Sequence, residues 1–208
     1  MHIRELLKIS RVIPVLELDD VDTAPELAEA LCAGGASVLE ITLRTPQAFE
    51  VMQAIKNKVP QAHVGAGTVN TKADIDRCKE LDLAFMVSPG LHAPLAEAAL
   101  NSGIPYLPGV STASDMLGAI DLGIDTLKFF PATAAGGTSM LKALGGPYSD
   151  IRFCPTGGIN PDNCEEFLSL KNVLCVGGSW VASKSLIKSK SWDEITRLAK
   201  SVNNTSAS

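Results

Sequence analysis

The sequence predicts an α/β fold in which eight parallel strands, each followed by a helix, close into a (β/α)8 barrel. Short runs rich in β-branched residues alternate with longer segments of helical periodicity along the 208 residues. Eight such units average about 26 residues each, which predicts a barrel with almost no insertions. The turn after the first strand, residues 19–22, contains no glycine, whereas an open doubly wound sheet carries a glycine-rich turn there. A compact TIM barrel is therefore favoured over the open sheet.

The element boundaries follow from the same alternation. The expected strands cover residues 12–18, 38–44, 63–68, 85–88, 106–110, 126–130, 152–156 and 174–178. The expected helices cover residues 24–33, 46–56, 72–81, 95–102, 113–122, 139–144, 161–170 and 192–202. A further N-terminal helix within residues 1–10 would place Ile3, Leu6 and Leu7 on one side.

Prolines mark several of these boundaries. Thr45-Pro46 and Asn160-Pro161 each place a capping residue before a proline suited to the first helical position. Pro14 lies inside the first strand and lacks the N–H that a strand ladder needs. This strand is therefore expected to begin late or to contain a bulge.

Composition and charge narrow the functional classes. The 18 basic and 23 acidic side chains give a net charge of −5, so the chain lacks the basic face that nucleic-acid binding requires. No apolar run approaches the ~20 residues of a membrane span, and the charged start is unlike a secretory signal. The five cysteines form no C-x-x-C pair, which favours reduced thiols over disulfides or structural zinc. We expect one cytoplasmic domain over residues 1–208, without nucleic-acid or membrane partners, and with a frayed tail at 203–208.

Side chains alternate between the two faces of a barrel strand, so parity separates packing from chemistry. In the second strand Leu39, Ile41 and Leu43 share the face expected to meet the helices. On the interior face or its rim lie Val38, Glu40, Thr42 and Arg44. A carboxylate and a guanidinium are costly there unless they are used or satisfy each other. Glu40 and Arg44 are thus either functional or a structural ion pair.

The sixth strand carries Lys128 on the interior face, between apolar neighbours. Loss of solvation in apolar surroundings favours the neutral amine, and a neutral amine can attack a carbonyl carbon. A lysine near a strand end could instead be a rim charge. However, Lys128, Glu40 and Arg44 share the inward face under one parity rule, and reaction chemistry in this fold lies at the C-terminal rim of the strands. The three side chains therefore predict an active site.

Two glycine pairs follow the last two strands. Gly157-Gly158 leads from the seventh strand towards a helix, and Gly177-Gly178 followed by Ser179 comes after the eighth. Glycines let backbone N–H groups converge on an anion, and the loops after strands seven and eight frequently form a phosphate site in these barrels. The pairs, together with the Ser179 hydroxyl, predict a phosphate-binding site.

Small residues end the third and fourth strands, in the segments 65–68 (GAGT) and 88–90 (SPG). Thr68 can donate a hydrogen bond to a carboxylate, whereas ordinary tapering of a packed interior is the favoured explanation for the glycines. Of the three histidines only His92 follows a strand at the active end, and we interpret it as a surface residue. No pair of histidines has metal-ligand spacing, so no metal is expected.

Six segments resemble the 2-keto-3-deoxy-6-phosphogluconate (KDPG) aldolases, a family that includes 4-hydroxy-2-oxoglutarate aldolases. They span nearly the whole chain: residues 39–45 (LEITLRT), 64–69 (VGAGTV), 88–90 (SPG), 127–132 (LKFFPA), 152–159 (RFCPTGGI) and 176–180 (VGGSW). The resemblance implies a class I, Schiff-base aldolase on a (β/α)8 barrel that works as a homotrimer without metal or other cofactor. Such a lyase cleaves 2-dehydro-3-deoxy-6-phosphogluconate, in the Entner–Doudoroff pathway, to pyruvate and D-glyceraldehyde 3-phosphate. Many members also cleave 4-hydroxy-2-oxoglutarate to pyruvate and glyoxylate.

The resemblance also implies residue roles. Lys128 matches the Schiff-base lysine and Glu40 the general base, while Arg44 and Thr68 match the groups that hold the keto-acid carboxylate. The other matching substrate-binding positions are Pro89, Phe130, Thr156 (linked to stereochemical choice at the carbinol carbon) and the phosphate-loop residues Gly157, Gly158, Gly178 and Ser179.

Three alternatives stay open at this point. The preferred substrate could be the galactonate-derived epimer, because epimer choice depends on pocket geometry around Thr156. A phosphosugar isomerase or epimerase would share the phosphate loops, but its reaction needs no interior lysine. A barrel that only binds a sugar phosphate would be stabilised by that ligand without turning it over.

Overall fold

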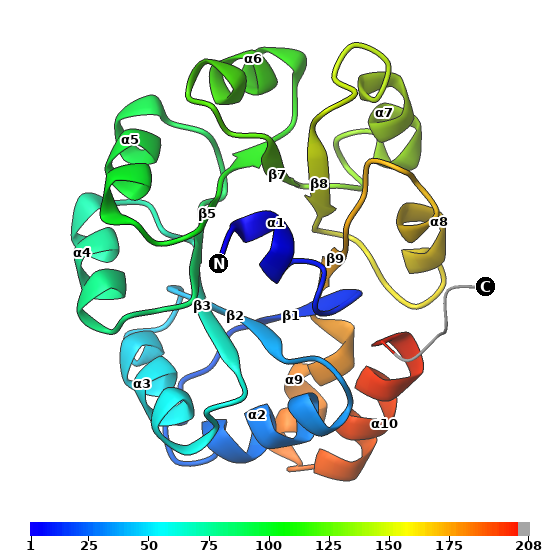
Figure 1. Ribbon diagram of the computed structural model, residues 1–208. Coiled ribbons are helices and arrows are strands. Elements are labelled where there is room, and N and C mark those ends of the chain that lie inside the picture. The colour runs from blue at the N-terminus through cyan, green and yellow to red at the C-terminus, as the bar shows by residue number, and fades with distance from the viewer. Residues whose placement is uncertain (204–208) are drawn as a thin grey trace.

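The computed structural model describes residues 1–203, in which parallel strands surround a central axis and helices form the outer ring (Figure 1). The strands are β1 (Val12–Leu16), β2 (Val38–Thr42), β3 (His63–Gly67), β4 (Phe85–Val87), β5 (Tyr106–Leu107), β6 (Gly109–Val110), β7 (Thr126–Phe129), β8 (Arg152–Pro155) and β9 (Val176–Gly178). The helices are α1 (Ile3–Leu6), α2 (Ala24–Ala33), α3 (Ala48–Lys58), α4 (Lys72–Glu80), α5 (Ala93–Ser102), α6 (Ala113–Asp121), α7 (Gly137–Leu144), α8 (Cys164–Leu168), α9 (Lys184–Lys188) and α10 (Trp192–Asn203), with a 3-10 turn η1 (Trp180–Ala182). The predicted α/β barrel class is confirmed.

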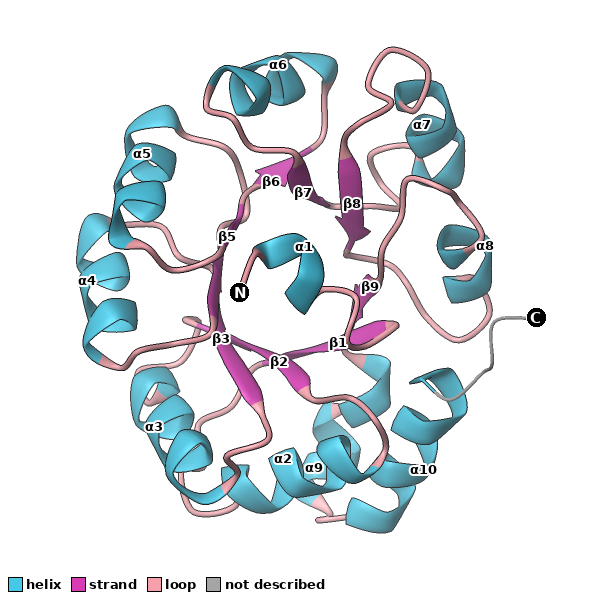
Figure 2. Ribbon diagram, viewed as in Figure 1, coloured by secondary structure: helices cyan, strands magenta, loops and turns pink. Residues whose placement is uncertain are grey.

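The strands form two parallel sheets around one ring (Figure 2). One sheet has the order β5-β4-β3-β2-β1-β9 and the other β6-β7-β8. Two isolated bridges join the segment of β8 to the segment of β9: Phe153 pairs with Val173, and Thr156 pairs with Gly177. At the opposite seam the expected strand 106–110 is divided at Pro108 into β5 and β6, because proline has no N–H to give to a ladder.

Helix α1 closes the N-terminal end of the ring, where Figure 1 shows it at the centre. Ile3, Leu6 and Leu7 are buried, as predicted, in an interior cluster with side chains of the strands. Arg4 anchors the helix from its other side: its guanidinium pairs with the Asp125 carboxylate at 3.0 Å and also donates to the backbone. The helix is shorter than the expected span of residues 1–10, but its apolar face fills the barrel end.

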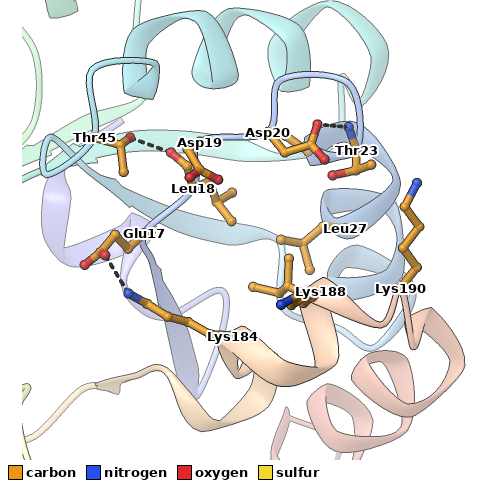
Figure 3. A pocket seen from close by; sticks show the side chains of 12 residues that line it. Glu17, Leu18, Asp19, Asp20, Thr23, Leu27, Thr45, Lys184, Lys188 and Lys190 are labelled. Atoms are coloured by element: carbon orange, nitrogen blue, oxygen red, sulfur yellow. Dashed lines mark hydrogen bonds and ion pairs between the residues drawn. The ribbon is translucent and has the colours of Figure 1, made fainter.

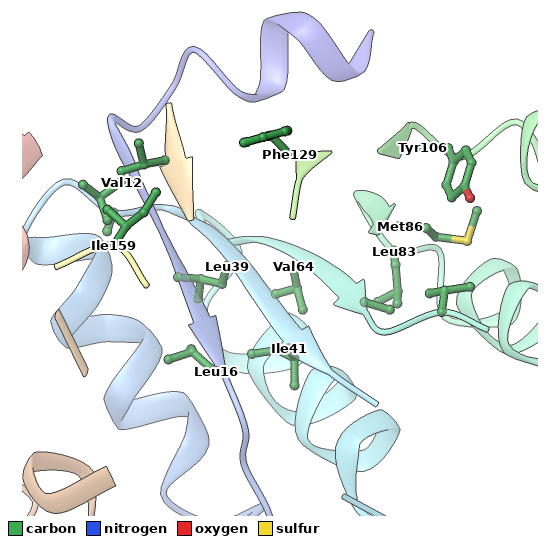
Figure 4. Close-up of a cluster of buried hydrophobic side chains, with 14 of the residues drawn as sticks. Val12, Leu16, Leu39, Ile41, Val64, Leu83, Met86, Tyr106, Phe129 and Ile159 are labelled. Carbon is green, nitrogen blue, oxygen red and sulfur yellow. The ribbon is translucent and has the colours of Figure 1, made fainter. Parts of the chain in front are cut away.

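A second, larger cluster lies between the strands and the helices (Figure 4). Leu39 and Ile41 of β2 belong to it, together with Leu16 and Val64 of the neighbouring strands. Val38, one residue away, belongs instead to the interior cluster. The alternation predicted for the second strand therefore separates the two cores.

The three boundary predictions based on Pro46, Pro161 and Pro14 are wrong. Helix α3 begins at Ala48 rather than at Pro46, because the Thr45 hydroxyl donates to the carbonyl of Leu18 instead of capping the helix. Helix α8 begins at Cys164, since the Asn160 side chain accepts the Asp162 N–H in a turn.

Pro14, the third case, does not delay or bulge β1. It is the last residue paired with β9, and pairing with β2 begins at Val15. The missing N–H therefore falls where the strand changes partner.

The C-terminal end of the described chain is ordered helix. Asn203, expected at the start of a frayed tail, is the last residue of α10; its side chain accepts from Val12 N–H and donates to the Ala199 carbonyl. The rest of the expected tail, 204–208, lies outside the described residues. In the part of the chain that is described, no helix combines the length and apolar character needed to cross a bilayer.

Candidate active site

Lys128 on β7 and Glu40 on β2 meet inside the barrel although 88 positions separate them in the chain. The lysine Nζ lies 3.0 Å from Glu40 Oε1, and the two residues are only 6% and 4% exposed. The Phe130 ring lies beside them, with its centroid 5.3 Å from Nζ. Parity predicted that both groups face the interior. A buried ion pair is weak as a stabilising device because both charges lose their hydration, so its presence points to chemistry.

The surroundings of Lys128 differ from the expectation in one respect. The amine is held by a carboxylate as well as by apolar walls, so apolar burial alone does not describe its environment. The alternative of a structural Glu40–Arg44 pair is wrong, because Glu40 pairs with Lys128 and Arg44 pairs with Glu17.

Glycine on β3 makes room for this pair. A Cβ added to Gly67 would overlap the Glu40 carboxyl oxygen, and one added to Gly65 would overlap the Phe85 ring. Tapering of the interior therefore does not fully explain these glycines. The absence of a side chain at Gly67 leaves the space that the Glu40 carboxyl occupies where it reaches Lys128.

Arg44 lies just beyond the end of β2, with its side chain about half exposed. Its Nε donates to Thr42 Oγ1 at 3.1 Å, and its Nη1 lies 3.0 Å from Glu17 Oε2. The other carboxylate oxygen of Glu17, Oε1, accepts a hydrogen bond from Lys184 Nζ at 2.6 Å. The Lys184 hydrogen bond and the Arg44 charge hold the pKa of the Glu17 carboxyl below its usual value.

Glu17 is a residue that our reasoning from the sequence missed. The signal was present: Ile13 lies in the interior cluster, so the alternation of the first strand carries Val15 and Glu17 to the same face. Glu17 then falls at the C-terminal rim, beside Arg44.

A cavity of about 350 Å³ adjoins this contact between the β1–α2 connection and α9 (Figure 3). Glu17 and Lys184 line it with further charged, polar and apolar groups, among them Asp19, Asp20, Leu27, Thr45, Lys188 and Lys190. Glu17 thus stands between the barrel rim and this cavity.

Thr68 directly follows β3 in a backbone conformation that β-branched residues rarely adopt, with φ of 62°. Such a conformation costs about 1–3 kcal/mol and persists where the surrounding structure imposes it, most often at functional sites. Pro89 and Gly90 follow β4 at the same rim and are exposed.

The two glycine pairs lie on adjacent chain segments. Thr156 bridges to Gly177, so Gly157-Gly158 and Gly178-Ser179 continue from paired positions. Gly157 and Gly158 have φ of 101° and 76°, and a Cβ on Gly158 would overlap the Thr133 side chain. Glycine is therefore required for this loop, and Ser179 beside it is exposed.

Thr156 carries a buried hydroxyl that has no hydrogen-bond partner in residues 1–203. Because an unpaired buried hydroxyl is unfavourable, such a group is expected to find its partner in a ligand or water.

The remaining reactive side chains stand apart. His92 is exposed before α5, as interpreted from the sequence. Burial raises the pKa of the Cys32 thiol to about 11 and that of Cys78 to about 12, so both are protonated packing groups. Within residues 1–203 no three His, Cys, Asp or Glu side chains are grouped as metal ligands would be. Metal independence stays a prediction for the chelation test below.

Comparison with known proteins identifies the family. The family model for KDPG and KHG aldolase matches residues 3–198. The 2-dehydro-3-deoxy-phosphogluconate aldolase of Pseudoalteromonas atlantica is 48% identical over 189 residues, 91% of this chain and 88% of that protein. The KHG/KDPG aldolase of Escherichia coli K12 is 45% identical over 195 residues, 94% of this chain and 92% of that protein.

A solved structure agrees with these relatives. The KDPG aldolase of Legionella pneumophila, captured with pyruvate as a covalent carbinolamine, superposes with a TM-score of 0.96 at 43% identity, covering 98% of this chain and 99% of that one. The chain therefore belongs to the KDPG and KHG aldolase family and is an aldolase, an enzyme of the lyase class.

Proposed function

We propose that the enzyme is a metal-independent class I aldolase that cleaves 2-dehydro-3-deoxy-6-phosphogluconate to pyruvate and D-glyceraldehyde 3-phosphate through a Schiff base on Lys128. We propose 4-hydroxy-2-oxoglutarate, cleaved to pyruvate and glyoxylate, as a second substrate. The observation that carries the proposal is the buried contact between Lys128 Nζ and Glu40 Oε1 at 3.0 Å. The carbinolamine with pyruvate in the Legionella relative supports it.

The first step makes the nucleophile. Glu40 takes a proton from the Lys128 ammonium, and the neutral Nζ attacks the C2 ketone of the substrate. The carbinolamine then forms, Glu40 returns the proton to its hydroxyl group, and water leaves to give an iminium ion. Because the two groups are already in contact, this transfer needs no rearrangement of the protein.

The iminium ion is the electron sink for bond cleavage. The Glu40 carboxylate removes the proton of the C4 hydroxyl, the C3–C4 bond breaks, and its electron pair forms an enamine at C3. The aldehyde leaves, Glu40 protonates C3, and hydrolysis of the iminium releases pyruvate and Lys128. Glu40 thus serves as base and acid in turn.

The rim residues position the substrate. Arg44 and Thr68 hold the carboxylate, and the Phe130 ring and Pro89 line the pocket around the reacting carbons. Thr156 supplies its hydroxyl, which has no partner in the described part of the chain, near the carbinol carbon and so contributes to stereochemical choice. The backbone N–H groups of Gly157, Gly158 and Gly178, with the Ser179 hydroxyl, bind the phosphate.

Borohydride trapping tests the covalent step. With pyruvate and borohydride, the peptide containing Lys128 should gain the mass of a reduced pyruvyl adduct, and the Lys128→Arg variant should gain none. An adduct on another lysine, or none, would overturn the mechanism. Exhaustive chelation should leave cleavage intact; loss of activity that a divalent metal restores would contradict metal independence.

A parallel assay defines the substrate. The gluconate-derived and galactonate-derived phosphorylated epimers, the unphosphorylated sugar acid and 4-hydroxy-2-oxoglutarate are compared by kcat/KM. We expect the gluconate-derived epimer to be cleaved best; preference for the galactonate-derived epimer would reassign the substrate while leaving the Schiff base in place.

We also propose that the enzyme is a homotrimer. The neighbouring helices α5 and α6 expose large apolar side chains, Leu100, Leu117 and Ile120, which a second copy of the chain would cover. Light scattering with size-exclusion chromatography should give three times the chain mass.

A further inference from the structure

Glu17 contacts two basic side chains that come from different segments of the chain. Its carboxylate lies 3.0 Å from Arg44 Nη1 and 2.6 Å from Lys184 Nζ. Arg44 follows β2, on the side of the keto-acid carboxylate, and Lys184 begins α9, five residues after the phosphate-loop Ser179. The Glu17 side chain is only 26% exposed, while those of Arg44 and Lys184 are 52% and 78% exposed. The acid is thus the least exposed member of the group.

Two of the three Arg44 nitrogens are already bound to the protein. Nε donates to Thr42 Oγ1, and the Thr42 hydroxyl in turn donates to the Leu16 carbonyl of β1. Nη1 pairs with Glu17, which follows β1 directly. Nη2 donates no hydrogen bond to any residue in 1–203, so its two N–H donors stay available for a carboxylate.

From this arrangement we propose that Glu17 is a positioning residue: it holds the Arg44 guanidinium in the orientation that binds the carboxylate of the keto-acid substrate. The inference rests on the proposed function, because it assigns that carboxylate to Arg44. Glu17 acts through Arg44 and touches no reacting atom.

Two physical arguments favour positioning. A long arginine side chain that is half exposed must lose rotamer freedom when it binds a ligand, and an anchor that orders it beforehand removes part of that cost. The charge balance also permits it, since Arg44, Glu17 and Lys184 sum to one positive charge and the group still attracts an anion. The low pKa of Glu17 keeps this balance at neutral pH.

A competing role for Glu17 predicts the opposite change in the KM. If Glu17 instead competed with the substrate carboxylate for Arg44, its neutralisation would free the guanidinium and lower the KM. Positioning requires that the KM rise while kcat stays nearly constant, because the chemistry at Lys128 and Glu40 is untouched.

The experiment compares Glu17→Gln and Glu17→Leu with the wild type, using KM and kcat for cleavage of the phosphorylated substrate and the pyruvate concentration that half-saturates borohydride trapping. Glu17→Gln should raise both concentrations about fivefold, the scale expected for losing one partly exposed ion pair. Glu17→Leu, which also loses the hydrogen-bond acceptor, should raise them further, and kcat should change less than about twofold in both variants.

Asp19→Asn is the matched control. It removes the same charge from the same cavity wall, two positions along the chain, but no hydrogen bond or ion pair joins Asp19 to Arg44. It should leave the KM within about twofold of the wild type. An equal rise in Asp19→Asn would show a long-range charge effect and overturn positioning.

The remaining outcomes are equally decisive. An unchanged or lower KM in Glu17→Gln, or a fall in kcat with the KM unchanged, would overturn the proposal. Failure of the wild type to trap pyruvate on Lys128 would instead overturn the proposed function. The two failures are therefore distinguishable in one set of measurements.

Discussion

The two ends of the barrel interior are built from the same strands and have opposite character. At the N-terminal end Ile13, Val38 and Cys154 pack with the apolar face of α1 in a sealed cluster. Two to four residues further along the same strands, on the same face, stand Glu17, Glu40 and Thr156, all of them polar. The interior face thus changes from apolar to polar within two to four residues along each strand.

This difference separates stability from chemistry along the barrel axis. The N-terminal end removes apolar surface from water. The C-terminal end retains a buried ion pair and a hydroxyl that has no partner within residues 1–203, each unfavourable for folding alone. Substitutions at the first end should therefore change the free energy of unfolding, and those at the second should change catalysis.

Lys128→Met should have the largest effect. Removing the nucleophile should lower kcat/KM at least about 10³-fold, because the covalent intermediate can no longer form. The measurement is steady-state cleavage, with circular dichroism to show that the fold is retained. Lys142→Met, at an exposed lysine of α7, should keep full activity. Substantial cleavage by Lys128→Met would contradict the assignment of catalysis to the C-terminal end of the barrel.

Leu7→Ala tests the sealed end. Leu7 is fully buried beside α1, so its truncation should cost about 2–5 kcal/mol of unfolding free energy through lost burial and a cavity. Urea denaturation measures this, and kcat at a temperature where the variant is folded should match the wild type. Ile9→Ala, at a residue that is 41% exposed, should cost less than about 0.5 kcal/mol. A drop in kcat for Leu7→Ala without destabilisation would contradict the separation of the two ends.

Gly67→Ala should affect catalysis more than stability. The added methyl group would overlap the Glu40 carboxyl and move it from Lys128, so kcat should fall about 10- to 100-fold, as expected for a misplaced acid–base group. Gly146→Ala is the control, because a Cβ there meets only an ordinary contact of 3.6 Å. If both variants behaved alike, Gly67 would have no special relation to Glu40.

The smallest expected effect is a pH dependence at Glu17. Its pKa in the folded protein lies below the ordinary value of 4.5, chiefly because of the Lys184 hydrogen bond and then the Arg44 charge. The carboxylate therefore stabilises the folded state above pH 4.5, and this contribution is lost as the pH falls through the lower folded pKa. Urea midpoints of the wild type and Glu17→Gln, measured from pH 7 downwards, should converge in that acidic range. A difference that persists or grows at low pH would argue against the ion pair.

Much of the site could be predicted from the sequence because strand alternation is a local property. Once residues 38–42 and 126–129 are recognised as strands, parity places Glu40 and Lys128 on the interior face without any knowledge of the partner strand. The glycine pairs were recognised for a similar reason, since they follow the two final strands directly.

Other features could not be predicted because they depend on contacts between distant segments. The Thr45 hydroxyl donates to the Leu18 carbonyl instead of capping α3. The Thr156 hydroxyl finds no partner among the described residues, and this depends on every neighbour around it. The short elements η1 and α9 carry too few residues to show a clear helical period.

The amino-acid sequence by itself determined the class of fold, the face on which each strand residue lies and the family to which the chain belongs, since periodicity and motifs reside in neighbouring residues. Only the tertiary structure decided that Glu40 pairs with Lys128, that Arg44 pairs with Glu17, and that Gly67 leaves the room between strands. The reason is physical: a charge selects its partner by distance and burial, and these are fixed only when the strands take their register around the ring.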